Sequence, residues 1–261
     1  MSVLRRRLMA ATQKMYITLM YNVTDASVST PLFHPSANLS GFPQTMTVDG
    51  TEVPLARSYR FGATGVHTVL LAADGITSIP NSAFYNCSSL ACVDGLSNVT
   101  SIGSCAFYYC TSLTRVDSLS SVIGIGYRAF YNCTSLTSVD GLSNVTSIGN
   151  GAFQGCSSLA CVDGLSNVIS IGNSAFQGCS SLACVDGLSN VISIGNYAFY
   201  YCTSLTKLVL SVSAPPQLGD SAFNSTTTNI YVPDASLDTY RTATNWSNYA
   251  SRIHPMSELN H

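Results

Sequence analysis

Cysteine is the residue type whose spacing in this sequence first suggests chemistry. Two cysteine pairs with four residues between their members would offer enough thiolates for a structural zinc site. Such pairs are Cys87/Cys92, Cys105/Cys110, Cys156/Cys161 and Cys179/Cys184. One member of each pair belongs to a column, Cys87 to Cys202, that recurs at a constant interval, also in units that lack the second member. We therefore interpret the column as small buried residues and predict neither a metal site nor a disulfide framework.

A column of aspartates also repeats, and stacked carboxylates about 5 Å apart would repel one another. Its members are Asp94, Asp117, Asp140, Asp163 and Asp186. One interpretation is a row of calcium ligands, since calcium binds carboxylate oxygens. We favour Asx-type turns, because every member except Asp117 precedes glycine and its carboxylate can accept hydrogen bonds from backbone N–H groups two residues on.

Residues that could support catalysis or bind a cofactor are sparse. The four histidines, His34, His67, His254 and His261, lie outside the repeated segment. Gly124, Gly126 and Ala129 satisfy the dinucleotide fingerprint G-x-G-x-x-A, but Gly126 is an ordinary repeat position and no helix of about ten residues is expected after it. We predict no enzyme and no cofactor, and keep a site in the N-terminal segment as the enzymatic alternative.

An internal repeat must position all of these residues. The stretch AFQGCSSLACVDGLSNVISIGN at 152–173 occurs again unchanged at 175–196, and the unit reads A-F-x-x-C-[ST]-S-L-x-x-V-D-G-L-S-N-V-x-S-I-G-N-x. Phenylalanine marks the register at Phe84, Phe107, Phe130, Phe153, Phe176 and Phe199, with Phe61 one period before and Phe223 one position beyond the next period. A period of about 23 residues predicts a solenoid, in which each unit buries its apolar side against its neighbours.

Each unit should contain two short extended pieces, around L-x-x-V-D and around V-x-S-I-G, and a single helical turn at A-F-x-x-C. The glycines after the isoleucine should supply a positive φ at a sharp corner. These glycines are Gly103, Gly126, Gly149, Gly172 and Gly195. We expect Phe153 to be buried between Phe130 and Phe176.

The sequence A-F-x-x-C-[ST]-S-L-x-x-V followed by V-x-S-I-G resembles the BspA-type leucine-rich repeat of bacterial surface proteins. The resemblance covers about residues 76–223, and residues 230–253 resemble the closing segment of that family. D-G-L-S-N replaces a turn of the T-I-P-D-S kind, which changes a corner. The resemblance implies a leucine-rich repeat solenoid and attachment at the cell surface to host or matrix proteins.

Four segments are predicted along the chain. Residues 1–14 form a basic tail, because the apolar stretch after the three arginines is broken by Gln13 and Lys14 and no clear signal peptide results. Residues 15–75 form a β-rich cap with a hairpin at Asp49-Gly50 and a degenerate first repeat at its end. The repeats occupy 76–223, and a strand and short helix cap them at 224–261.

The net charge of −2 and the 9% of charged residues provide no basic stripe for nucleic acid, and no apolar run is long enough to span a membrane. We predict a non-enzymatic adhesion module, secreted or at the cell surface, that binds a host or matrix protein or a glycan. The alternative is a structural spacer without a ligand of its own.

The positions after each phenylalanine vary and are rich in tyrosine, which suits recognition. The candidate ligand-binding residues are Tyr85, Tyr108, Tyr109, Tyr131, Tyr200 and Tyr201, together with Arg115 and Lys207 on the strand face. The alternative is that these rings merely cover the convex side.

The residue before the valine of L-x-x-V should point outward. That position holds Cys92, Arg115, Ser138, Cys161, Cys184 and Lys207. Cys161 and Cys184 should therefore lie side by side, about 5 Å apart, with Cβ atoms parallel instead of facing. We predict free, partly exposed thiols at these two positions and buried thiols at Cys156 and Cys179.

Overall fold

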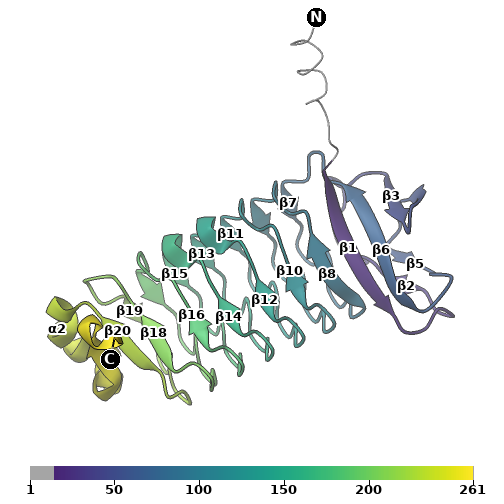
Figure 1. The fold of residues 1–261 in the computed structure, drawn as a ribbon. Coiled ribbons are helices and arrows are strands. Elements are labelled where there is room, and N and C mark those ends of the chain that lie inside the picture. Colours follow the sequence, from purple (N-terminus) through teal and green to yellow (C-terminus); the bar gives the residue numbers. More distant parts are fainter. Residues whose placement is uncertain (1–14, 261) are drawn as a thin grey trace, which may run out of the picture.

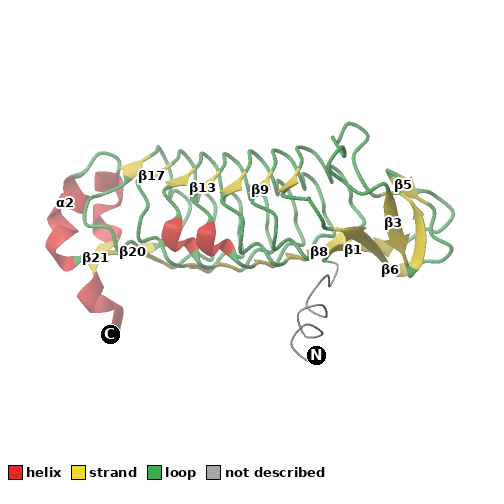
Figure 2. Ribbon diagram, turned by 90° about the horizontal axis from the view of Figure 1, so that it is seen from above, coloured by secondary structure: helices red, strands yellow, loops and turns green. Residues whose placement is uncertain are grey.

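The computed structural model describes residues 15–260, and the predicted basic tail lies outside the described residues. The chain forms an elongated stack of coils with a β-rich cap at the N-terminal end and helices at the C-terminal end (Figure 1). Two rows of short parallel strands run along the stack on opposite sides, as the view from above shows (Figure 2). The chain is therefore a repeat solenoid, as the period of its sequence predicts.

The first row of strands comes from L-x-x-V and carries the residue before valine on its outer surface. It comprises β8 (Leu90–Asp94), β10 (Arg115–Val116), β12 (Ser138–Val139), β14 (Cys161–Val162), β16 (Cys184–Val185) and β18 (Lys207–Val209). Where neighbouring strands pair, the register advances by one repeat, for example from Arg115 to Ser138 and from Cys161 to Cys184. The row consists of three sheets, with breaks between β12 and β14 and between β16 and β18. In the shortest strands the valine is buried while its predecessor reaches the surface, because successive side chains alternate across a strand.

The second row comes from V-x-S-I and forms a continuous seven-stranded sheet. It comprises β7 (Ser78–Ile79), β9 (Ser101–Ile102), β11 (Gly124–Ile125), β13 (Ser147–Ile148), β15 (Ser170–Ile171), β17 (Ser193–Ile194) and β19 (Gln217–Leu218). The isoleucine of each strand, or Leu218 in the last, points into the core.

Phenylalanine rings stack along the axis between the two rows. Ring centroids from Phe84 to Phe223 lie 5.0–5.4 Å apart in nearly parallel planes. Phe153 is fully buried between Phe130 and Phe176, which confirms the predicted register. Phe61, which the repeat spacing placed in this column, instead packs on His67 and Tyr59 in the cap.

Phe33 takes the place expected for Phe61. Its ring covers Phe84, the first ring of the stack, at a centroid distance of 5.3 Å. The cap reaches the stack from a loop that carries no repeat signature, so counting one period back from Phe84 misassigned the position.

The A-F-x-x-C segment is not the helical turn that was predicted. Its backbone N–H groups donate to the next coil, as from Phe107 to Ala129 and from Tyr109 to Tyr131, in addition to short i to i−3 turns. Residues before the alanine and before the cysteine have φ near +60°, for example Cys105 and Tyr109. Left-handed residues break a helix, and they turn the chain while keeping the coils hydrogen-bonded. The 3₁₀ helices η1 (Leu142–Asn144) and η2 (Leu165–Asn167) lie instead at the D-G-L-S-N corner.

The glycines after the isoleucine do not have the positive φ that was predicted. Glycine is needed at these positions because neighbouring coils approach too closely for a Cβ atom. A Cβ on Gly149 would lie 2.7 Å from the carbonyl carbon of Gly126, which is backbone and cannot move aside. Left-handed glycines occur instead at the Asp-Gly pairs, such as Gly164 with φ +79°, and in the A-F-x-x-C turns, such as Gly155 with φ +77°.

The buried cysteine column does more than fill space. Each thiol from Cys110 to Cys202 donates a hydrogen bond of 3.0–3.1 Å to the carbonyl of the phenylalanine in the preceding coil, as Cys156 does to Phe130. Cys156 and Cys179 are fully buried as predicted, and burial raises the pKa of Cys202 to about 12. The column therefore connects coils as well as packing between them.

The N-terminal cap contains the predicted strands and the Asp49-Gly50 hairpin. Its strands are β1 (Tyr16–Val23), β2 (Thr30–Pro31), β3 (Thr45–Val48), β4 (Thr51–Pro54), β5 (Ser58–Tyr59) and β6 (Gly65–Ala72). β1 lies antiparallel between β6 and β8, so it is β1 that covers the exposed edge of the first repeat strand. A covered edge removes a site for unwanted strand pairing.

The C-terminal cap follows its predicted plan. It contains β20 (Asn229–Val232), η3 (Asp234–Ser236), α2 (Leu237–Thr242), η4 (Trp246–Arg252), β21 (Ile253–Pro255) and η5 (Met256–Asn260). Trp246 and Tyr249 lie on Phe223, the last ring of the stack, at centroid distances of 6.0 and 5.6 Å. The cap thus keeps the final phenylalanine from water. Among the described residues, no helix has the length and apolar character needed to cross a membrane.

Candidate functional site

Three tyrosines form a stacked row on the side of the solenoid made by the A-F-x-x-C turns, here called the turn face. Tyr85, Tyr108 and Tyr131 come from consecutive coils, and their ring centroids lie 4.7 Å apart at each step. The interplanar angles are 5° and 8°. Because the faces of the rings cover one another, the row presents ring edges and phenolic hydroxyls to the outside. His34 of the N-terminal cap meets Tyr85 edge-on at 5.0 Å and extends the row.

Three further tyrosines of the turn face occupy the left-handed positions described above. Tyr109, Tyr197 and Tyr201 have φ between +57° and +60°. Their exposed fractions are 39%, 44% and 52%. Bulky residues are uncommon in this region of conformational space, which disfavours a Cβ.

Other units fill the same positions with residues that suit a positive φ. The counterparts of Tyr109 and Tyr201 are Asn86, Asn132, Gly155, Gly178 and Ser225. The backbone therefore demands a left-handed residue in every coil, and at two of these positions the chain supplies an exposed tyrosine instead of asparagine or glycine.

A cation adds to the tyrosine row. The guanidinium of Arg128 lies 5.0 Å from the ring centroids of both Tyr127 and Tyr131. Tyr127 is itself exposed. Cation–π contacts of this kind orient both partners, so Arg128 holds the edge of the row in place.

The tyrosines form two groups separated by the duplicated coils. In those coils Gln154 and Gln177 occupy the stacking position, and the Gln154 amide donates to Gln177 at 3.0 Å. Tyr200 follows in the next coil, with Tyr201 at 4.5 Å and Tyr197 at 5.6 Å in edge-on contacts. The turn face thus carries a larger aromatic group near the N-terminal cap and a smaller one near the C-terminal cap.

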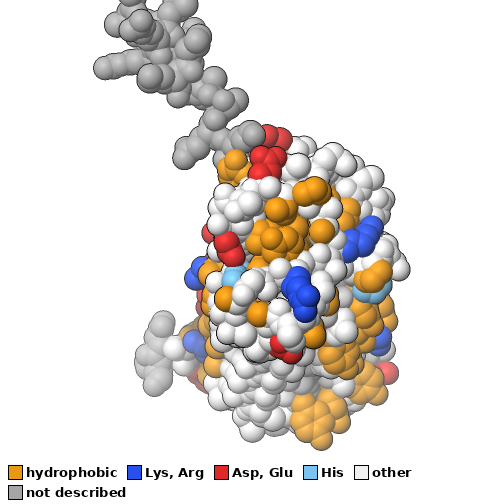
Figure 3. Space-filling view, turned by 90° about the vertical axis from the view of Figure 1, so that its right-hand side faces the viewer, with side chains coloured by type: hydrophobic (Ala, Val, Ile, Leu, Met, Phe, Trp, Pro, Cys, Tyr) orange, Lys and Arg blue, Asp and Glu red, His pale blue; other side chains and the backbone are white. Residues whose placement is uncertain are grey.

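An apolar hollow adjoins the larger group at the N-terminal cap. It has a volume of about 370 Å³ and is lined by Phe33, His34, Arg57 and Tyr85, among others. Figure 3 looks onto this end of the molecule and shows hydrophobic side chains gathered in patches, with single charged side chains between them.

Arg115 and Lys207 lie apart from these tyrosines. They are on β10 and β18 in the first row of strands, with exposed side chains, as predicted. Arg115 Nε lies 3.0 Å from the carboxylate of Asp117 and 3.1 Å from the sulfur of Cys92. The candidate ligand-binding residues therefore fall on two different faces.

The aspartate column does not form the predicted row of Asx turns. Asp94 accepts a hydrogen bond from the N–H of Gly95, the next residue, and another from the Ser118 hydroxyl. Burial raises the pKa of Asp117 above its usual value, against the effect of Arg115. Asp186 accepts from the thiol of Cys184, so the column's environment differs from coil to coil.

Comparison with known families explains the repeat. The model of the BspA type leucine rich repeat region matches residues 57–183 and 125–244, with six copies. The chain belongs to the BspA-type leucine-rich repeat family. The matched residues begin before and end after the 76–223 span that the motif suggested, and so include parts of both caps.

Solved structures of leucine-rich repeat proteins resemble this chain over part of its length. A leucine rich cell surface protein from Faecalibacterium prausnitzii is 34% identical over 51% of this chain, with a TM-score of 0.45. A leucine-rich repeat protein from Bacteroides ovatus is 22% identical over 60%, with a TM-score of 0.40. The matched parts span 38% and 53% of those two chains. Comparison with curated proteins found no match.

Three residues of this BspA-type chain were missed by the analysis of its sequence. The larger aromatic group includes Tyr127 and Arg128, and the smaller one includes Tyr197. All three residues precede the phenylalanine of their units. The signal that could have found them is departure from the repeat. Other units carry asparagine, serine or, in the last unit, aspartate at the Tyr127 position, and mostly serine or glycine at the Tyr197 position.

Proposed function

We propose that the chain is a non-enzymatic binding module, secreted or at the cell surface, whose turn face takes an extended protein or glycan partner. The observation that supports it best is the exposure of tyrosines at left-handed backbone positions. Strained residues that do not serve the core are typical of functional surfaces. The surface location is part of this proposal, because the repeats of the chain are of the BspA type that bacterial surface proteins carry.

The placement of the tyrosines separates folding from recognition. Tyr109 and Tyr201 leave 39% and 52% of their surface exposed. Their aromatic contacts are with other tyrosines of the turn face and not with the phenylalanine core. Asparagine or glycine meets the same backbone requirement elsewhere in the repeats with less strain. Tyrosine in these positions therefore favours a role in contacting a partner, since its large and rigid ring anchors interfaces.

The geometry of the row favours a partner that lies along the solenoid axis. The hydroxyls of Tyr85, Tyr108 and Tyr131 repeat at the spacing of the coils, with ring centroids 4.7 Å apart. Arg128 supplies a cation beside them. Few charged groups are present, so binding relies on aromatic edges, hydroxyl hydrogen bonds and area more than on ion pairing.

The experiment uses the repeat itself to provide conservative variants. Tyr109→Asn and Tyr201→Asn introduce the residue that Asn86 and Asn132 supply at the same position, and Tyr197→Ser introduces the residue of Ser174. The purified chain is screened against immobilised matrix proteins and a glycan array. We expect the triple variant to fold and to bind the selected partner at least about tenfold more weakly, as for loss of aromatic anchors.

A control on the second row of strands distinguishes the turn face from other surfaces. Ile169 and Ile192 are exposed there, and Thr100 and Thr146 occupy the same repeat position. Ile169→Thr with Ile192→Thr should leave binding unchanged. Binding lost in this control but kept in the tyrosine variant moves the site to the strand surface, and no binding to any partner favours the structural spacer.

A further inference from the structure

The duplicated coils place two cysteines and two aspartates together on the outer surface of the first row of strands. Cys161 on β14 pairs in register with Cys184 on β16. The sulfurs of both cysteines and a carboxylate oxygen of Asp163 all lie within 4.8 Å of one another. Asp186 adds a carboxylate oxygen 3.0 Å from the Cys184 sulfur. This group lies on a different face from the tyrosines, so it is independent of the proposed function.

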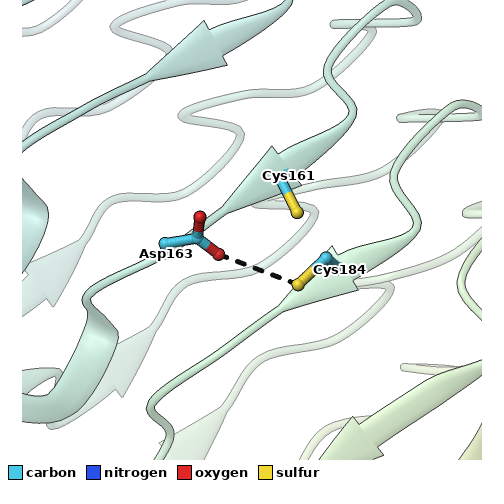
Figure 4. A group of neighbouring side chains, drawn as sticks. All are labelled: Cys161, Asp163 and Cys184. Carbon is cyan, nitrogen blue, oxygen red and sulfur yellow. Dashed lines mark hydrogen bonds between the residues drawn. The ribbon is translucent and has the colours of Figure 1, made fainter.

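The side chains converge from adjacent coils. Figure 4 shows the sulfur of Cys161 directed toward Cys184 and the carboxylate of Asp163 turned toward the Cys184 sulfur, at 3.7 Å. Both thiols are partly exposed, as the sequence predicted, and both carboxylates are exposed. An ion from solvent can therefore reach all four groups.

The corresponding group nearer the N-terminal cap shows what such a cluster requires. There Cys92, Arg115 and Asp117 occupy the positions of Cys161, Cys184 and Asp186, and the guanidinium of Arg115 contacts both the sulfur and the carboxylate, at 3.1 and 3.0 Å. In the duplicated coils a second cysteine replaces the arginine. The sulfur and carboxylate are retained while the built-in cation is lost.

Among the described residues, the carboxylates of Asp163 and Asp186 form no ion pair that would replace the one made by Arg115. Within residues 15–260, the Arg115–Asp117 pair is the sole contact between an arginine or lysine and a carboxylate that is close enough for an ion pair. Lys207 follows Cys184 by one repeat but does not form such a contact. On the other side, the residue one repeat before Asp163 is a further carboxylate, Asp140.

We propose that Cys161, Cys184 and Asp163 bind one divalent metal ion of the zinc class, with Asp186 or water as the fourth ligand. Two thiolates with carboxylate oxygens select a borderline-soft ion that accepts tetrahedral geometry, in preference to calcium or magnesium. Sulfur and oxygen ligands of tetrahedral zinc lie about 3.3–3.8 Å apart, so the group needs only a small contraction from its present spacing. Each ligating thiol releases its proton to solvent, and binding two thiolates releases two protons.

Cobalt(II) tests this site because its absorption reports both thiolate ligation and tetrahedral geometry. The reduced, full-length chain is titrated with Co²⁺ in the presence of a non-thiol reductant, and Zn²⁺ is then added in competition. We expect sulfur-to-cobalt charge-transfer absorption that saturates at one ion per chain and disappears as Zn²⁺ displaces the cobalt. Absence of this absorption in the folded chain overturns the proposal.

Matched variants locate the ion. Cys161→Ser and Cys184→Ser introduce the residue that Ser138 supplies at the same position, and each should abolish the two-thiolate spectrum. Asp163→Asn should weaken Co²⁺ at least about tenfold, within the range for ligand-sphere changes. Cys92→Ser is the control, because Cys92 has the same repeat position but a built-in arginine, and it should bind Co²⁺ as the parent does.

Two spectroscopic results and one redox result would contradict the assignment. One is a spectrum that survives in the Cys161→Ser/Cys184→Ser double variant, which places the ion elsewhere. The other is a spectrum that develops only as the circular dichroism of the fold is lost, which indicates binding by the buried cysteine column after unfolding. Formation of a Cys161–Cys184 disulfide that withstands the reductant also contradicts the proposal, since it would remove both thiolates.

Discussion

The coil that contains Tyr131 and the duplicated coils beside it have the same interior and different exteriors. Inside, Phe130, Phe153 and Phe176 stack at 5.1 and 5.3 Å with planes 3° apart. On the turn face, Tyr131 belongs to the stacked tyrosine row, whereas the Gln154 side chain donates a hydrogen bond to that of Gln177. Stacking therefore constrains each interior residue from both sides, whereas an exterior residue needs only to fit its backbone conformation and is free to vary.

This difference explains why departures from the repeat at the surface are better indicators of function than departures in the interior. An interior residue contacts its copies in the coils before and after it, so one change creates a mismatch on two sides. An exterior residue on the turn face must only accept its φ and remain hydrated. Departures from the repeat at the surface, such as Tyr109, Arg115 and the Cys161–Cys184 pair, are therefore the places where function is to be sought.

The interior half of the comparison is tested most strongly by Phe153→Ala. Phe153 is fully buried and contacts a ring on each side, so its removal leaves a cavity that neither neighbour can fill. The expected loss is about 3–5 kcal/mol in the free energy of unfolding, measured by chemical denaturation. Tyr131→Gln, which introduces the exterior residue of the duplicated coils, serves as the control and should change stability by much less. A loss below about 1 kcal/mol for Phe153→Ala would show that the stack does not hold the coils together.

Two corner glycines provide the second test, because they are glycine for different physical reasons. Gly149→Ala should cost about 1–3 kcal/mol, since the new Cβ would meet the backbone of Gly126 at 2.7 Å. Gly164→Asn should cost far less, because Gly164 is left-handed and its nearest neighbour to a Cβ lies 3.4 Å away. Denaturation of both variants compares the two, and a larger loss for Gly164→Asn would reverse the explanation of these corners.

The N-terminal cap should respond to pH near neutrality through a histidine, a residue type that the repeats lack. The hydrogen bond to Asp49 raises the pKa of His67, with Nδ1 2.6 Å from the carboxylate. Burial alone would raise the pKa of Asp49, but hydrogen bonds from His67 and the Thr68 N–H outweigh it and lower the value. The pair thus stabilises the cap above the unfolded pKa of aspartate, about 3.9, and below that of histidine, about 6.5.

Raising the pH through the folded pKa of His67 should therefore remove this contribution, and lowering it through the folded pKa of Asp49 should do the same. Because the pair is close to solvent, the effect should be under about 1 kcal/mol. Thermal unfolding of the full chain between pH 5 and 9, compared with His67→Asn, measures it. Equal pH dependence in the parent and the variant would assign the titration to other groups.

The sequence predicted the features that depend on repetition. The burial of Phe153, both strands of each unit and the adjacency of Cys161 and Cys184 follow from the constant period of the repeat. The C-terminal cap was predictable from local signals, because Pro233 and Asp234 precede a short amphipathic helix.

Features that depend on distances between coils were not predictable in the same way. The reason for glycine at Gly149 is the approach of Gly126 from the previous coil, and the Cys156 thiol bonds to a carbonyl of the previous coil. No local pattern reports these contacts. Phe33 replaced Phe61 at the end of the stack for the same reason, since a cap without a repeat has no period to count.

Recognition, and not stabilisation of the fold, is the role proposed for the exposed tyrosines of the turn face. Chemical denaturation of the Tyr109→Asn/Tyr201→Asn variant tests it most directly, because asparagine accepts the left-handed backbone that tyrosine resists. We predict a free energy of unfolding equal to that of the parent or higher by up to about 1 kcal/mol per site. A loss of more than about 1 kcal/mol would show that these rings stabilise the solenoid, and would contradict the separation of interior and exterior roles.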